Sequence, residues 1–129
     1  MNTVLVVVDV QNDFCGGGPL AVPDADAVLP VVNGLMREFR RVILTQDWHP
    51  PRHVSFASSH PGHQVFGRIT LPYGEQVLWP DHCVEGTPGA AFHPRLEVPA
   101  DALIVRKGIH RGIDSYSAFS PSSSRAAVA

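Results

Sequence analysis

The feature that most constrains the fold is an unbroken apolar run over residues 4–8, which ends at an acidic residue, Asp9. Such a run of mostly β-branched side chains is typical of a strand buried on both faces, as in a parallel sheet. Open parallel sheets place their functional sites at the carboxyl ends of their strands. We therefore interpret Asp9 as a candidate catalytic group at that edge.

The next segments predict a βαβ unit. Apolar side chains recur at helical spacing over residues 28–39, and either Asp24 or Asp26 is expected to cap this helix. Residues 42–45 and 102–105 form short apolar runs that predict a second and a third strand. The first two strands should be parallel, with a right-handed crossover through the helix.

Polar side chains follow the second and third strands at the point where each ends. Asp47 and His49 come after the second strand, and Lys107 comes after the third. We expect these groups to meet Asp9 at one edge of the sheet. Lys107 is either an ordinary solvated lysine or a cation that lowers a thiol pKa or stabilises an oxyanion.

The spacing of Asp47 and His49 is compatible with a metal site. In extended backbone, residues two apart lie on the same face, so a carboxylate and an imidazole can share one divalent ion. The alternative is that Asp47 caps a turn and His49 lies on the surface. A third ligand would be needed, and the candidates are His82, His53, His60 and His63.

Composition excludes several classes of function. The chain has 129 residues and a net charge of −2, which indicates one domain and argues against nucleic-acid or membrane partners. Its 2 cysteines suit a reducing, cytoplasmic compartment. Residues 50–99 have little periodicity and are expected to form an ordered, ligand-bearing loop. Residues 120–129 are expected to be a disordered tail.

Four motifs together carry a specific resemblance. DVQNDFCGGGPLAV, TQDWHPPRHVSFASSH, LWPDHCVEGTPGAAFHP and RKGIHRGIDSYSAF resemble, in this order and spacing, the nicotinamidases (pyrazinamidases) among the isochorismatase-like hydrolases. The resemblance covers residues 1–119, which would be the N-terminal part of one domain. It implies a three-layer α/β/α fold with a doubly wound parallel sheet, truncated here to about three strands. The DWH and WPDHC motifs favour nicotinamidase over isochorismatase itself.

The resemblance also implies roles for individual residues. Asp9 would be the base of an Asp–Lys–Cys triad, and Lys107 its cation. The metal ligands would be Asp47, His49 and His82, and His53 matches an extra ligand of some members although its spacing is short. Zinc is the expected metal, with iron or manganese as alternatives. Phe14 and Trp79 would pack on the ring of nicotinamide or a pyrazinamide-like amide, although they could equally be core residues, and Tyr116 matches a pocket position.

The sequence departs from the family in one important respect. The family's nucleophilic cysteine follows a fourth strand that this chain does not reach, while Cys15 and Cys83 match non-catalytic positions. We therefore expect a truncated chain that is inactive alone, whose first strand forms an exposed edge. The alternatives are a non-catalytic metal- and nicotinamide-binding fragment, or another cysteine amidohydrolase of the superfamily. Assembly into a homo-oligomer is left open.

Overall fold

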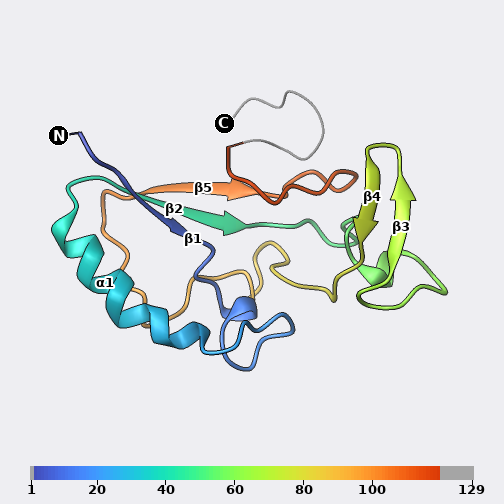
Figure 1. The fold of residues 1–129 in the computed structure, drawn as a ribbon, viewed down its shortest axis with the longest axis horizontal. Helices are drawn as coiled ribbons and strands as arrows, with labels where there is room; N and C mark the ends of the chain where they lie inside the picture. Colours follow the sequence, from blue (N-terminus) through green and yellow to red (C-terminus); the bar gives the residue numbers. More distant parts are fainter. Residues whose placement is uncertain (1, 120–129) are drawn as a thin grey trace.

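The structure is a computed structural model that describes residues 2–119 (Figure 1). The main elements are β1 (Leu5–Val8), α1 (Val28–Glu38), β2 (Val42–Asp47), β3 (Arg68–Leu71), β4 (Gly74–Val77) and β5 (Leu103–Lys107). Short 3-10 helices span Asn12–Phe14, Ala25–Ala27 and Ala57–Ser59. The helix and the three expected strands are confirmed, and the expected tail at 120–129 lies outside the described residues.

The central sheet has the strand order β1-β2-β5, with both pairs parallel. The register places Val8 opposite Thr45, and Asp47 opposite Lys107. All three strands therefore end at the same side of the molecule, toward the β3–β4 hairpin (Figure 1). As expected, β1 lies at one edge of the sheet.

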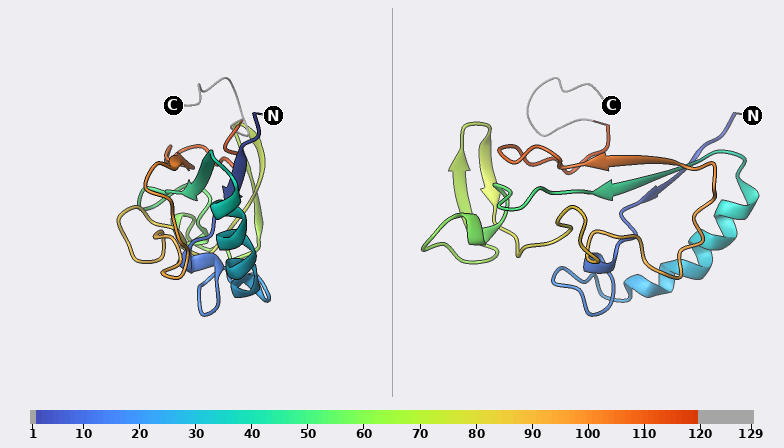
Figure 2. Two further views of the ribbon diagram at one scale, coloured as in Figure 1. Left: turned by 90° about the vertical axis from the view of Figure 1, so that its left-hand side faces the viewer. Right: turned by 180° about the vertical axis from the view of Figure 1, so that it is seen from behind.

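Helix α1 packs on one face of the sheet (Figure 2). Its buried residues Leu29 and Met36 belong to the core cluster, which is completed by Val7, Val10, Val42, Leu44 and Leu96. Val8 and Leu103 are 62% and 58% exposed, respectively. Within residues 2–119, the sheet therefore has a helical layer on one face, which is an α/β arrangement. No helix in this part of the chain is long and apolar enough to cross a membrane.

The prediction that Asp24 or Asp26 caps α1 is wrong. A 3-10 turn over Ala25–Ala27 precedes the helix, so Ala27 occupies the N-cap position and makes no side-chain capping bond. The carboxylate of Asp26 instead accepts a hydrogen bond from the backbone N–H of Gly16, at 3.1 Å. Asp26 therefore stabilises the glycine-rich turn that follows β1.

The segment between β2 and β5 is ordered but is not only loop. It contains the antiparallel β3–β4 hairpin, which was not predicted from the sequence. Further along, isolated bridges join His49 to Val84 and Phe56 to Trp79. These bridges hold the aromatic and histidine-bearing parts of the segment beside the carboxyl end of β2.

Candidate metal and catalytic site

The carboxyl ends of the three parallel strands bring two acids and one lysine together. The Nζ atom of Lys107 lies 2.8 Å from Oδ2 of Asp9 and 2.5 Å from Oδ1 of Asp47. The parallel register explains the second contact, because Asp47 and Lys107 are paired on neighbouring strands. The sequence-based expectation that these side chains share one edge is confirmed.

Thr45 on β2 binds the carboxylate oxygen of Asp9 that Lys107 does not contact. Strand β1 ends at Val8, and Asp9 follows with a φ of 52° that turns the chain out of the sheet. The hydroxyl of Thr45 donates to Oδ1 of Asp9 at 2.6 Å, which leaves Oδ2 for Lys107. Sequence reasoning missed Thr45, because nothing in the local pattern distinguishes it from other strand residues.

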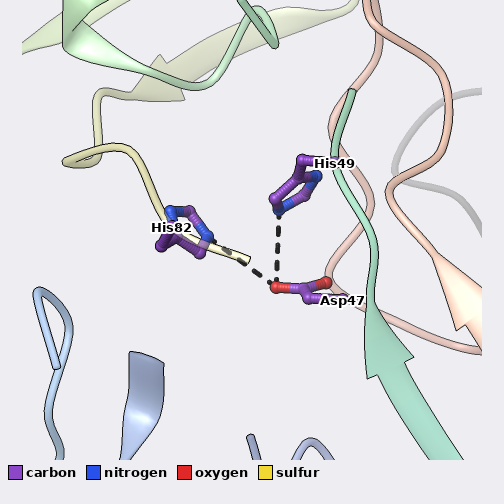
Figure 3. Close-up of side chains that lie close together, drawn as sticks. All are labelled: Asp47, His49 and His82. Atoms are coloured by element: carbon purple, nitrogen blue, oxygen red, sulfur yellow. Dashed lines mark ion pairs between the residues drawn. The ribbon is translucent and has the colours of Figure 1, made fainter. Parts of the chain in front are cut away.

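The side chains of His49 and His82 both point toward the carboxylate of Asp47 (Figure 3), which also contacts Lys107. Oδ2 of Asp47 lies 3.5 Å from Nε2 of His49 and 3.8 Å from Nε2 of His82. All three residues are buried, and the ligand atoms lie within 4.8 Å of one another. Asp47 thus directs one oxygen to the lysine and the other to the two imidazoles.

The tautomers of both histidines suit metal binding. Nδ1 of His49 lies 2.9 Å from the carbonyl oxygen of Gly108, and Nδ1 of His82 lies 2.8 Å from that of Pro80. A carbonyl can only accept, so each Nδ1–H donates, and each Nε2, which faces Asp47, is the nitrogen that remains available to a metal. Two imidazole nitrogens and one carboxylate oxygen form a donor set that fits a divalent metal with open positions.

The charges of this cluster support one another. Burial opposes ionisation of Asp47, but the neighbouring imidazoles of His49 and His82 and the charge of Lys107 hold its pKa well below the usual range. Burial also disfavours the charged form of Lys107, yet Asp47 and Asp9 raise its pKa above the ordinary value. At neutral pH the site therefore contains a buried cation between carboxylates.

Gly108 allows the imidazole of His49 to approach the backbone. Its φ is +66°, and a Cβ at this position would lie 2.4 Å from Cε1 of His49. A side chain would therefore be both strained and in collision with the ring. Because Gly108 directly follows Lys107, the turn at the end of β5 positions both the side chain of Lys107 and the imidazole ring of His49.

His53 lies beside the group formed by Asp47, His49 and His82, and both of its ring nitrogens contact other atoms of the protein. Its ring stacks on His49 with centroids 4.2 Å apart, and its Nε2 lies 3.2 Å from the carbonyl oxygen of Ile113. The Nδ1 atom accepts from the N–H of Ser55 and lies 2.7 Å from its hydroxyl. Burial and the neighbouring His49 charge lower the pKa of His53 to about 4. His53 thus packs as a neutral ring. With His49 and Asp114 it forms a second group of described residues whose ligand atoms are close enough to hold a metal, and His60 and His63 belong to neither group.

A pocket of about 290 Å³ opens onto this cluster. It is lined by the three residues that the resemblance places at the substrate, Phe14, Trp79 and Tyr116. Asp9, Lys107 and the group Asp47, His49 and His82 also line it. The indole Nε1 of Trp79 donates to the hydroxyl of Tyr116 at 3.2 Å, and Gln76 of β4 donates to the same oxygen at 3.1 Å. Sequence reasoning missed Gln76, which contacts Tyr116 from outside the lining, and it missed four lining residues, Leu20, Val22, Asp114 and Ser115.

Among the described residues, neither cysteine lines this pocket. Cys83 is fully buried, and burial together with the charge of Asp47 raises its pKa. Cys15 is buried as well, and burial and Asp26 raise its pKa. The backbone at Cys83 is left-handed, with a φ of 46°.

Comparison with known proteins adds independent evidence. Residues 3–120 match the family model of the isochorismatase domain. The nicotinamidase of Acinetobacter baylyi is 58% identical over 118 residues, which are 92% of this chain and 55% of that protein. The chain thus spans about half the length of the curated relatives it matches.

Solved structures give the same picture. A nicotinamidase/pyrazinamidase of Acinetobacter baumanii superposes with a TM-score of 0.90 and 59% identity, covering 94% of this chain and 58% of that one. A pyrazinamidase of Pyrococcus horikoshii in complex with zinc superposes with a TM-score of 0.67 and 36% identity, covering 89% and 55%.

Proposed function

This chain belongs to the isochorismatase family, and we propose that it is the part of a nicotinamidase that holds the metal, the base and the cation. One observation carries the proposal. The carboxylate of Asp47 faces two imidazole nitrogens with one oxygen and Lys107 with the other, while Lys107 also pairs with Asp9. A metal-binding group and an acid–cation pair thus share one residue and open into one pocket.

Asp47, His49 and His82 would hold the metal. Zinc is the first candidate because the Pyrococcus horikoshii pyrazinamidase is in complex with zinc, while iron and manganese also suit this donor set. When bound, such a metal supplies a Lewis-acid position for the pyridine nitrogen of nicotinamide. The chain's own contribution is a buried, pre-oriented donor set.

Asp9 and Lys107 would activate the thiol that attacks the carboxamide of the substrate. The overall reaction consumes nicotinamide and water and forms nicotinate and ammonia. Asp9 takes the proton of the attacking thiol, and the charge of Lys107 favours the thiolate. Phe14, Trp79 and Tyr116 would pack on the flat ring of nicotinamide or pyrazinamide, because all three line the pocket.

Neither cysteine of this chain suits the role of the attacking thiol. Both are buried and have raised pKa values, and neither lines the pocket among the described residues. We therefore propose that residues 1–119 form part of one hydrolase domain, and that this chain binds metal and amide without turnover. Two free cysteines also suit a cytoplasmic site of action.

The test measures nicotinamide binding by calorimetry and ammonia release, with the purified chain supplied in turn with zinc, manganese and iron. We expect metal-dependent binding that is lost in His49→Ala, and no ammonia. The surface variant Arg37→Ala is the matched control, because Arg37 pairs with Glu97 on the exposed face.

Two results would contradict the proposal. A metal-loaded chain that fails to bind nicotinamide would overturn the assigned substrate, and a panel of other small amides would then identify a different amidohydrolase. Ammonia release that disappears in Asp9→Ala and in one Cys→Ala variant would show that a cysteine of this chain is the nucleophile.

A further inference from the structure

The side chain of Gln11 lies beside Asp47, one of the three proposed metal ligands, where β1 no longer pairs with β2. Strand β1 ends at Val8, which pairs with Thr45, two residues before Asp47 at the end of β2. The N–H of Asp47 donates to Oε1 of Gln11 at 2.8 Å, and Nε2 of Gln11 donates to the carbonyl oxygen of Asp47 at 2.8 Å. The side-chain amide thus takes the role that a strand peptide would play.

The amide of Gln11 has no hydrogen-bonding capacity to spare for solvent. The residue is 0% exposed, and its second N–H donates to the carbonyl oxygen of Ala90 at 2.9 Å. Both donors and the acceptor therefore have partners inside the protein. If the amide were removed, the N–H and C=O of Asp47 on this side would be buried without partners, which proteins rarely tolerate.

The backbone of Asp47 is held from both sides as a result. On the other side, β5 pairs with β2 at Lys107, and the N–H of Trp48 donates to the carbonyl oxygen of Lys107 at 2.9 Å. The point from which the Asp47 carboxylate projects is therefore fixed, and Lys107 contacts its Oδ1. Its Oδ2 is therefore kept between the Nε2 atoms of His49 and His82.

We infer that Gln11 is a positioning residue of the metal site, which sets the direction of the Asp47 carboxylate without contacting the metal. This inference rests on the proposed metal site and adds a residue that acts through the backbone of a ligand. Groups that orient metal ligands typically change metal affinity by about 10–100-fold when they are replaced.

The chain offers a matched control in Gln46. Gln46 is also buried, precedes Asp47 directly and donates from Nε2 to the same carbonyl oxygen of Ala90, at 2.8 Å. No hydrogen bond connects its side chain to the backbone of Asp47 among the described residues. Gln46→Met therefore removes a buried amide of the same kind while leaving Asp47 held by Gln11.

The experiment measures zinc affinity by chelator competition for the whole chain and for Gln11→Met, Gln11→Glu and Gln46→Met. The visible spectrum of the cobalt-substituted chain reports ligand geometry. Gln11→Met should weaken zinc binding about 10–100-fold and alter the cobalt spectrum, whereas Gln46→Met should do neither. Gln11→Glu keeps an acceptor for the N–H of Asp47 and loses the donors, so it should fall between them and serves if Gln11→Met does not fold.

The possible outcomes distinguish the metal site itself from the role of Gln11. A wild-type chain that takes up no zinc would overturn the proposed metal site, and the positioning role with it. A wild-type chain that binds zinc, with folded Gln11 variants that match its affinity and spectrum, would overturn the positioning role alone. That role is also overturned if Gln46→Met weakens zinc binding as much as Gln11→Met does.

Discussion

The Nζ atom of Lys107 lies 2.8 Å from Oδ2 of Asp9, and this contact joins the first and last strands of the sheet in sequence order. Strand β2 lies between them and supplies Asp47, whose Oδ1 is 2.5 Å from the same Nζ. One buried cation thus lies between two carboxylates. The catalytic pair and the metal group that we propose are therefore coupled through Lys107.

Replacing this cation should leave the buried carboxylate of Asp47 and the half-buried carboxylate of Asp9 without their lysine partner. We expect Lys107→Met to lower the free energy of unfolding of the metal-free chain by about 3–5 kcal/mol, as is usual when one partner of a buried ion pair is removed. Urea denaturation measures the change. The control Arg37→Ala breaks an ion pair whose side chains are 66% and 55% exposed, and it should cost less than about 1 kcal/mol. Equal effects of the two variants would contradict the account.

Gly108 should be sensitive to even one added methyl group. Gly108→Ala places a Cβ 2.4 Å from Cε1 of His49 at a φ of +66°, so we expect about 1–2 kcal/mol of backbone strain and a displaced ring. Zinc affinity should therefore fall together with stability. Gly112→Ala is the matched control, because a Cβ there would meet nothing within 4 Å. The prediction fails if the two variants bind zinc equally well.

Asp13 should stabilise the loop that carries His82. Its Oδ2 accepts from the N–H of Cys83 at 2.7 Å, directly after His82. Asp13→Ala leaves that N–H without its acceptor and should cost about 1–3 kcal/mol of stability, with weaker zinc binding. Asp13→Asn keeps an acceptor oxygen and should retain most of both. An alanine variant as stable as the asparagine variant would argue against this role.

The two tyrosines should titrate late in the folded chain. Burial raises the pKa of Tyr116 and of Tyr73, so the neutral phenols are favoured by folding. Their contribution to stability is fully present below the unfolded pKa of about 10 and is lost as the pH rises through the higher folded values. Ultraviolet titration of the phenolate should give a midpoint above that of the chain in guanidinium.

Gln76 provides a second test of the same titration. Its side-chain N–H donates to the hydroxyl oxygen of Tyr116 and lowers the pKa of that phenol, against the larger effect of burial. Gln76→Leu should therefore move the phenolate midpoint further upward. A midpoint that stays in place or moves down would show that Tyr116 is not held as described.

The position of the acid and lysine groups could be predicted because it follows from simple geometry. Short apolar runs mark parallel strands, and parallel strands deliver the residues at their ends, Asp9, Asp47 and Lys107, to one edge. The approach of His82 to that edge could not be derived from spacing. It depends on a long connecting segment whose course is fixed by bridges such as Phe56–Trp79, and the family resemblance supplied it.

Other features escaped prediction for physical reasons. The β3–β4 hairpin consists of two four-residue strands, too short for a clear alternation of apolar and polar side chains. Asp26 carries an ordinary helix-capping signal, but a 3-10 turn intervenes and the carboxylate binds Gly16 instead. Gln11 and Gln76 act on backbone groups or side chains distant in sequence, and single glutamines carry no local signature of such contacts.

The central claim is tested most directly by the zinc K-edge absorption spectrum of the zinc-loaded chain, together with a measurement of the number of zinc ions bound per chain. The account predicts one zinc per chain, with nitrogen and oxygen ligands at about 2.0–2.2 Å and an imidazole signal that decreases in His82→Ala. A chain that binds no zinc would contradict it. So would a sulfur ligand at about 2.3 Å, because the metal would then be held by a cysteine and not by Asp47, His49 and His82.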